Sequence, residues 1–478
     1  MSRRLPALLA LLVALGALVF GTRSELAETT PTFSVSANGW MPSAPPLGGL
    51  TETWFCPGVP ATGVDDVDGE IVIANRTADR MVGSILLVNS DQENLRLALD
   101  VDGWASATVD LDDLLPGDVV GALIEIDGGG GIVEQRSLRP SGDSQAACAN
   151  ATSDTWYLAD GFTVDGSLDQ IILTNPFEQT VVANLEFATQ EGSRRPQSYS
   201  GLTVPPRSVR VIDLGAPGAG AQSEPILAVT VETTRGRLVV GRAQTFSGGG
   251  RVGSQVTLAA PALRDQWWFA DGAKGPDVAE RFSIYNPTDD KVEDDVIFLG
   301  IDIPVLLDPI VVPAREVVTY DPGDELDLPD GRYATVIATS TNEPTVVIER
   351  AVSQTVGDTT ATSVLLGATP RQDGYVASTW HIGVSPDEPV DEALIVYNAD
   401  NTPGTVTVSA VGQSGPVPVP GLEDVPIGGA AVVAIDLTDP IVLGRELILE
   451  STARVFVERS FPTGRGDTRS SSWAVPAG

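Results

Sequence analysis

The chain has 478 residues, and 64 acidic against 29 basic residues give it a formal net charge of −35. This charge repels nucleic acids and anionic membrane surfaces, so neither is expected to bind the main part of the chain. The length predicts three or four domains, and a hydrophobic content of 42% suffices for ordinary cores.

The first 24 residues predict an export segment. Arg3 and Arg4 precede an apolar run over residues 5–20, and positive charges before such a run hold the N-terminus in the cytoplasm. Residues 1–24 are therefore a signal peptide or a membrane anchor that contacts the membrane, and we favour the anchor. Both alternatives predict an extracytoplasmic location for the rest, secreted or membrane-anchored. Residues 25–49, which contain several prolines, predict an extended linker.

A four-fold internal repeat occupies the remainder, and four kinds of marker recur in one order at nearly equal spacing. The opening strands carry Trp54, Trp156, Trp267 and Trp380. The next turns carry Asn75, Asn175, Asn286 and Asn398. An alternating apolar run then ends at Asp110, Asp213, Asp321 and Asp436. A late strand ends at Arg136, Arg242, Arg350 and Arg459.

Each copy predicts an all-β domain. Short runs rich in Val, Ile, Leu and Thr alternate with Gly, Pro, Asn and Asp, which is typical of strands and turns. About 100 residues with some seven strands is the size of one immunoglobulin-like β-sandwich. We therefore predict four tandem sandwiches, copies one to four, at 50–149, 150–262, 263–372 and 373–478. An eight-bladed β-propeller with two blades per copy is the alternative.

Short, proline-marked joints between the copies favour a stiff rod with all four in line, roughly 140 Å long. Cys56 and Cys148, the two cysteines of the chain, lie at opposite ends of copy one. In an exported chain this placement predicts a disulfide. We attribute it to the terminal position of copy one, which would have a neighbour on one side only.

No catalytic, cofactor or metal site is predicted. His381, the single histidine, follows Trp380 where the other copies have an aromatic residue, so we interpret it as a packing residue. Acidic stretches at 66–69, 100–103 and 321–330 resemble fragments of calcium loops, but none completes the twelve-residue EF-hand pattern. We interpret them as solvated turns.

Paired Glu-Arg residues at 349–350 and 458–459 predict buried ion pairs. Adjacent side chains of a strand face opposite sides, and an inward arginine needs a partner. Asp160 and Asp271 of the opening strands are the candidates.

The export segment, the Trp-x-x-Ala-Asp-Gly stretches from Trp156 and Trp267, and the Asn-Pro turns at 175 and 286 resemble a family of secreted or membrane-anchored actinobacterial proteins of unknown function with tandem β-domains. Copies one and four depart from the turn motif, with Arg76 and Ala399 in place of proline. The resemblance implies location and no activity.

We therefore expect a non-catalytic cell-envelope protein, a spacer or binding module, whose partner is an envelope glycan or protein. The alternative is a carbohydrate-active enzyme or sugar-binding protein, since a glycosidase needs only two carboxylates. Sugar binding requires exposed aromatic residues, and the candidates are Trp104, Trp268 and Trp473.

Overall fold

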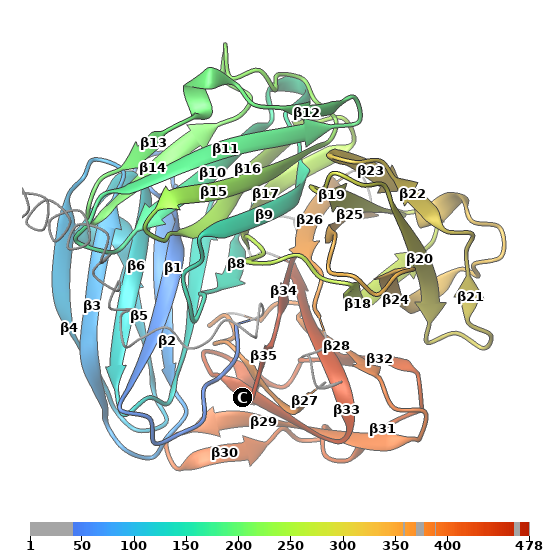
Figure 1. Ribbon diagram of the computed structural model, residues 1–478. Helices are drawn as coiled ribbons and strands as arrows, with labels where there is room; N and C mark the ends of the chain where they lie inside the picture. The colour runs from blue at the N-terminus through green and yellow to red at the C-terminus, as the bar shows by residue number, and fades with distance from the viewer. Residues whose placement is uncertain (1–41, 357–358, 370–376, 388, 463–468, 478) are drawn as a thin grey trace, which may run out of the picture. The chain divides into compact units, whose positions relative to one another are not determined.

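The computed structural model describes residues 42–477 except 357–358, 370–376, 388 and 463–468 (Figure 1). The predicted export segment and most of the predicted linker lie outside the described residues. Within the described ranges, no helix is both long enough and apolar enough to cross a membrane.

Copy one consists of two antiparallel four-stranded sheets. In spatial order, the first sheet contains β1 (Thr51–Ala61), β6 (Gly117–Asp127), β3 (Met81–Asn89) and β4 (Asn94–Val101). The second contains β5 (Ser106–Asp110), β2 (Asp68–Asn75), β7 (Gly131–Leu138) and β8 (Ser144–Ala147). A short helix, α2 (Leu111–Leu114), follows β5.

Copies two and three repeat this strand order. The first sheet of copy two contains β9 (Thr155–Gly161), β15 (Leu227–Arg235), β11 (Val181–Thr189), β12 (Gly192–Arg194) and β13 (Leu202–Val204). Its second sheet contains β14 (Ser208–Asp213), β10 (Leu168–Asn175), β16 (Val239–Gly248) and β17 (Arg251–Leu258). The first sheet of copy three contains β18 (Gln266–Lys274), β24 (Gly331–Thr339), β20 (Val292–Leu299), β21 (Val305–Leu306) and β22 (Ile310–Val312). Its second contains β23 (Glu316–Tyr320), β19 (Val278–Asn286), β25 (Val347–Val356) and β26 (Thr359–Leu366).

Copy four differs in that its strands form one nine-stranded sheet, because β33 (Leu447–Pro462) pairs with strands of both layers. The first half of β33 pairs with β27 (Ala377–Ile382) and β29 (Gly404–Gly412). Its second half pairs with β28 (Ala393–Asn398) and β34 (Arg469–Trp473). The remaining strands are β30 (Gly415–Pro418), β31 (Val425–Ile427), β32 (Val432–Asp436) and β35 (Val475–Pro476). Single 3-10 turns occur at η1 (Val164–Gly166), η2 (Gln197–Tyr199), η3 (Pro322–Asp324) and η4 (Pro440–Val442).

The prediction of all-β sandwich copies is confirmed: copies one to three each have two separate sheets in one strand order, and in copy four β33 joins the two layers. They do not form a propeller. The repeat markers explain the shared order physically, since the four opening tryptophans are at most 1% exposed and anchor the cores. The indole N–H of Trp267 donates to the carbonyl of Val346 at 3.1 Å, so its polar atom is also satisfied.

The turn asparagines are also buried residues of the core and not exposed turn residues. The Asn286 amide nitrogen lies 2.8, 3.2 and 3.1 Å from the carbonyl oxygens of Asp290, Val312 and Pro313. Its Oδ1 accepts the N–H of Thr288 at 3.0 Å. One side chain thus fixes its own turn and a distant crossing segment, and the turn asparagines of the other copies make corresponding bonds.

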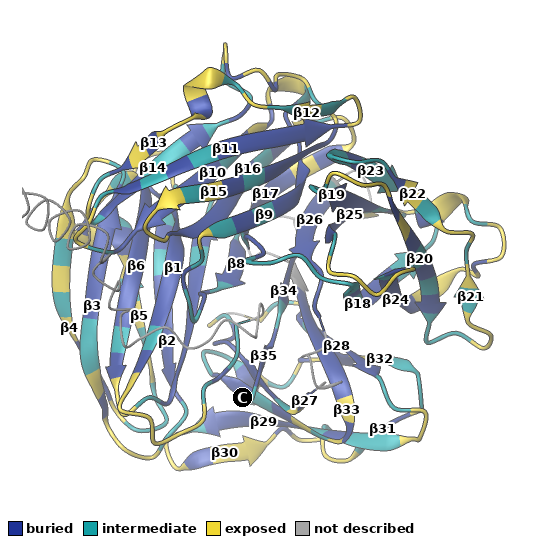
Figure 2. Cartoon of the chain, viewed as in Figure 1, coloured by how far each residue is buried: buried dark blue, intermediate teal, exposed yellow. Residues whose placement is uncertain are grey.

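The predicted rod is wrong, because the four copies form a closed ring of contacts. Around the centre, β8 contacts β17, β17 contacts β26, β26 contacts β34, and β34 returns to β8 (Figure 1). The Gln145 amide in copy one donates to the Ser472 hydroxyl in copy four at 3.4 Å. Ala44 pairs with Ala477 beside this junction. The central strands are mostly buried, and exposed residues gather in the outer loops (Figure 2).

The structure bonds Cys56 to Cys148, with a Cα–Cα distance of 4.5 Å. The reason given above for this disulfide is wrong, since copy one contacts copies two and four and is not a terminal repeat.

Candidate functional site

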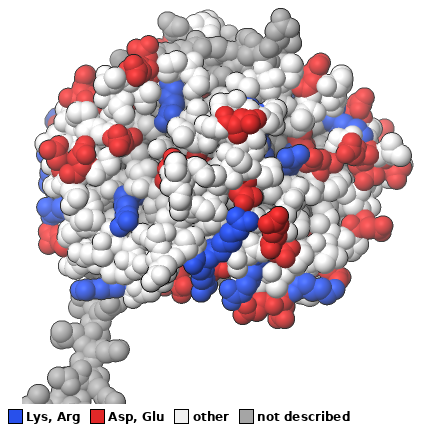
Figure 3. Space-filling model, turned by 90° about the horizontal axis from the view of Figure 1, so that it is seen from above, with Lys and Arg blue, Asp and Glu red and all other residues white. Residues whose placement is uncertain are grey.

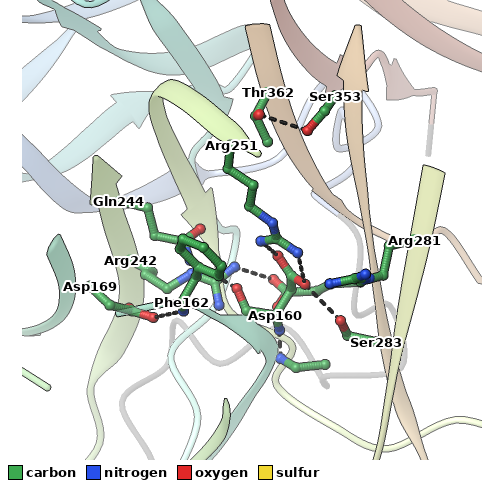
Figure 4. A network of polar contacts seen from close by, with 12 residues as sticks. Asp160, Phe162, Asp169, Arg242, Gln244, Arg251, Arg281, Ser283, Ser353 and Thr362 are labelled. Carbon is green, nitrogen blue, oxygen red and sulfur yellow. Dashed lines mark hydrogen bonds and ion pairs between the residues drawn. The ribbon is translucent and has the colours of Figure 1, made fainter. Parts of the chain in front are cut away.

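Each joint between consecutive copies is built on the opening strand, and the joint between copies two and three shows how (Figure 4). Irregular pairing of β9 frees the N–H groups of Ala159 and Asp160 from the ladder. Both donate to Glu349 of copy three, at 2.7 and 2.6 Å. Arg242 of copy two donates to the other oxygen of this carboxylate at 3.0 Å. Glu349 and Arg242 are almost completely buried.

The joint between copies three and four repeats this geometry. Glu458 accepts the N–H groups of Ala270 and Asp271 at 3.2 and 3.1 Å, and it also accepts from Arg350. Glu280 of copy three lies 3.6 Å from the same arginine. Burial raises the pKa of Glu280 to about 7, although Arg350 opposes the rise.

The ring closes through the corresponding carboxylate of copy one, Glu134. A Cβ on Gly383 of copy four would lie 1.8 Å from its Oε2, so any larger residue at this position would displace the Glu134 carboxylate. The other copies have Pro57, Ala159 and Ala270 there. Burial raises the pKa of Glu134, while the charges of Arg459 and Arg136 lower it.

The joint between copies one and two has uncharged residues in place of the glutamate, the arginine and the second carboxylate of the other joints. The carbonyls of Val133, Val240, Ile348 and Val457 accept equivalent strand-end N–H groups. This register aligns Gln135, and not Arg136, with Arg242, so the repeat marker assigned to Arg136 is wrong. Gln135 accepts the N–H of Gly58 at 2.9 Å. Gly69 of β2 stands where copies two and three have the carboxylates Asp169 and Glu280. Gly241 of copy two stands where copies three and four have Glu349 and Glu458, and its lack of a side chain leaves room for the Pro57 ring.

Buried ion pairs were predicted from the Glu-Arg pattern, but the proposed partners were wrong. Asp160 binds Arg251 through two bonds of 2.6 and 3.0 Å and accepts from Ser283 of copy three at 2.6 Å (Figure 4). Burial alone would raise the pKa of Asp160, but Arg251 and Ser283 hold it below its usual value. Asp271 pairs with Arg332. The partner of each buried arginine is instead the glutamate of the following copy, Glu349 for Arg242 and Glu458 for Arg350. The sequence pattern did not indicate this pairing.

His381 is buried and lies 3.0 Å from Glu446 through its Nδ1 atom. The aromatic residues at this position in other copies face the next copy: Phe55 lies 6.2 Å from Phe177, and Trp268 stacks on Phe456 at 5.2 Å. The slot is therefore a joint-packing position.

The acidic stretches show no gathered ligands. Within the ranges that the structure describes, no three His, Cys, Asp or Glu side chains are placed to hold a metal ion. Asp100 pairs with Arg80, and Asp321 pairs with Arg281 at 2.8 Å. Acidic and basic side chains lie interspersed on the face seen in Figure 3.

Asp294 is a buried carboxyl outside these sets. It is 0% exposed, and neither side-chain oxygen has a hydrogen-bond partner among the described residues. Burial raises its pKa to about 7, and Asp295 adds to the rise. Counted from the turn asparagine, the corresponding residue of copy two is Ala183.

We expect Asp294→Ala to raise the free energy of unfolding by about 2 kcal/mol at pH 8, because an unpaired charge leaves the core. The folded pKa exceeds the unfolded value, so the wild type loses stability as pH rises from about 4 to 7. The gain should therefore disappear near pH 4.5. Urea unfolding at both pH values measures it, with exposed Asp302→Ala as control; an equal gain at both pH values would contradict this explanation.

The centre of the ring holds a hollow to which all four copies contribute. Its empty space amounts to about 540 Å³, a figure that includes the solvent in its open mouth, and its wall includes Ala147, Leu258, Leu366 and Trp473. These four residues are equivalent, since each precedes the strand-end N–H described above. Three of the side chains are large and one is alanine, so the four cannot fill the axis evenly.

The wall also contains polar groups without partners. Gln255 is 1% exposed and Thr257 is 5% exposed. Among the described residues, neither Oε1 of Gln255 nor Oγ1 of Thr257 has a hydrogen-bond partner. Among the described residues, those that line the wall include no ionisable side chain. Gln255 Oε1 and Thr257 Oγ1 are thus buried acceptors in the wall that lack a donor in the described part of the chain.

The three candidate tryptophans are all partly buried. Trp268 lies in the joint between copies three and four. Trp104 lies beside Gly415 of copy four. Only Trp473 of the three lines the hollow, and its N–H donates to the carbonyl of Leu366 at 2.8 Å. The strand that closes each copy, which ends near Ala147, Leu258, Leu366 and Trp473, contributes to this hollow because the copies form a ring, and the predicted rod does not bring these strands together.

Known proteins give limited comparisons. No curated protein matches the sequence. A crystal structure of Thermotoga maritima 1070 is 19% identical over 23% of this chain and 97% of that one, with a TM-score of 0.21. A tetra-tandem repeat from the extending region of a large adhesion protein is 12% identical over 85% of this chain and 94% of that one, with a TM-score of 0.12. Neither similarity supports a conclusion.

A family model matches residues 132–377, from β7 of copy one to the start of β27 in copy four. The match covers about half of the chain and contains the whole joint between copies two and three, with Ala159, Arg242 and Glu349. The protein belongs to DUF5719, a family of unknown function.

Proposed function

We propose that the protein is a non-catalytic binding module of the cell envelope, located outside the cytoplasm, and that the axial hollow is its binding site. The observation that carries the proposal is the convergence of four equivalent strands on one hollow with unpaired polar groups. A spacer would need only length, which a closed ring does not provide.

Two further observations support this function. The buried carboxylates Glu349 and Glu458 are engaged with backbone N–H groups and arginines at the joints, which accounts for them structurally. The Cys56–Cys148 bond suits an oxidising compartment, in agreement with the predicted export segment.

The test compares the wild type with Ala147→Leu, which places a larger side chain in the hollow. Fractionated envelope glycans and lipids are added to each protein, and the melting temperature is measured. A bound ligand stabilises the folded state in proportion to ln(1 + [L]/Kd), so at least one fraction should raise the Tm of the wild type only. Equal shifts for both proteins, or release of reducing sugar from a glycan fraction, would overturn the proposal.

A further inference from the structure

The wall of the axial hollow limits the chemistry of its ligand. The described residues of the wall carry no charge, and the apolar ones include Leu258, Leu366, Trp473 and Val475. Moving an ion into such surroundings without a partner is strongly unfavourable. A charged ligand, including a carboxylate or phosphate placed inside the hollow, is therefore disfavoured.

The unpaired groups set a second requirement. Gln255 uses its amide nitrogen in a 3.0 Å bond to the carbonyl of Val256, which leaves its Oε1 as an acceptor. The Thr257 hydroxyl, two residues further along β17, can accept as well. A ligand without a donor would bury both groups unsatisfied, at a cost in affinity.

The number of polar groups in the wall sets a third requirement for the ligand. Gln145 and Ser472 already bond to each other across the junction of copies one and four. Two unpaired side-chain groups on one strand cannot satisfy a ligand with hydroxyls on every side. The ligand must therefore be polar at one end and apolar over the rest of its surface.

Building on the function proposed above, we propose that the axial hollow binds an uncharged, mostly apolar molecule, or the end of one, that carries a hydroxyl group. The hydroxyl donates to Gln255 Oε1 or Thr257 Oγ1, and the apolar body lies among Leu258, Leu366 and Trp473. A lipid alcohol belongs to this class, whereas a polyhydroxylated sugar and a fatty acid do not.

Three probes of similar size test this requirement on the full chain: benzyl alcohol, toluene and benzoate. Ligand-observed NMR titration measures their affinities. We expect benzyl alcohol to bind about 10-fold more tightly than toluene, because toluene leaves the acceptors unpaired. Benzoate should show no competition with benzyl alcohol. Gln255→Met combined with Thr257→Val should reduce benzyl alcohol to the affinity of toluene, while the exposed control Gln92→Met should not.

The outcomes separate this inference from the proposed function. If toluene binds as tightly as benzyl alcohol, or benzoate competes, the hydroxyl requirement is wrong while the hollow remains a binding site. If no probe binds, or Ala147→Leu leaves every affinity unchanged, the hollow is not the site and both proposals fail. Urea unfolding of each variant shows whether its fold is intact, and the single variants Gln255→Met and Thr257→Val provide the comparison if the double variant is unstable.

Discussion

Replacing Glu349 by alanine is expected to lower the free energy of unfolding by about 3 to 5 kcal/mol. The change leaves the Arg242 guanidinium buried without its closest partner and the N–H groups of Ala159 and Asp160 without an acceptor. Equilibrium unfolding in urea measures the loss. The exposed pair of Glu178 and Arg207 is the matched control, and Glu178→Ala should cost less than about 1 kcal/mol.

The neutral joint between copies one and two provides a sharper comparison. Glu349→Gly and Arg242→Gln reproduce Gly241 and Gln135 of that joint, and Asp169→Gly on β10 reproduces Gly69 on β2. The triple variant removes these three charges together, while Ala159 stays where the neutral joint has Pro57. The triple variant should therefore be less destabilised than the sum of the three single variants, by at least about 2 kcal/mol. Additive losses would show that the charged set does not act as a unit.

Asn286→Asp is expected to cost about 3 kcal/mol or more at pH 7.5. The substitution places a carboxylate oxygen against the carbonyls of Asp290, Val312 and Pro313, where the amide now donates. A protonated aspartic acid can donate again, so the loss should shrink as the pH is lowered toward 4. Urea unfolding across this pH range measures both effects.

The control for this variant is Asn342→Asp, the same chemical change at an exposed turn residue. Asn342 has a φ of 57°, a conformation that aspartate also tolerates, so the control should change stability by less than about 0.5 kcal/mol. A loss at Asn286 as small as that of the control would mean that the side chain does not hold the crossing segment.

The turn asparagines show how far the sequence leads and where it stops. Asn75 and Asn398 are followed by Arg76 and Ala399, yet their amides make the same kind of long-range bonds as Asn286 does. The repeat was visible because this amide is required in every copy. Proline at the next position is a local preference, so its absence did not change the fold.

The arrangement of the copies could not be predicted in the same way. Prolines near the joints indicate short connections, but a short connection fixes no angle between two domains. The angle comes from contacts such as Glu349 with Ala159, which join residues far apart in the sequence. The hollow exists only because the copies meet at that angle. The sequence patterns therefore predicted the strands that form its wall, but not that these strands meet around a hollow. The Glu134, Glu349 and Glu458 series would have indicated the joints, had Gln135 been aligned correctly.

Ring closure also changes how the protein is expected to come apart. In an open array, an end repeat contacts one neighbour and can unfold alone at little cost to the others. Here β8 meets both β17 and β34, so loss of any copy breaks two joints and exposes the apolar surface of both neighbours. No copy is placed to fray first, and the four should melt in a single transition in which partly folded arrays are scarce.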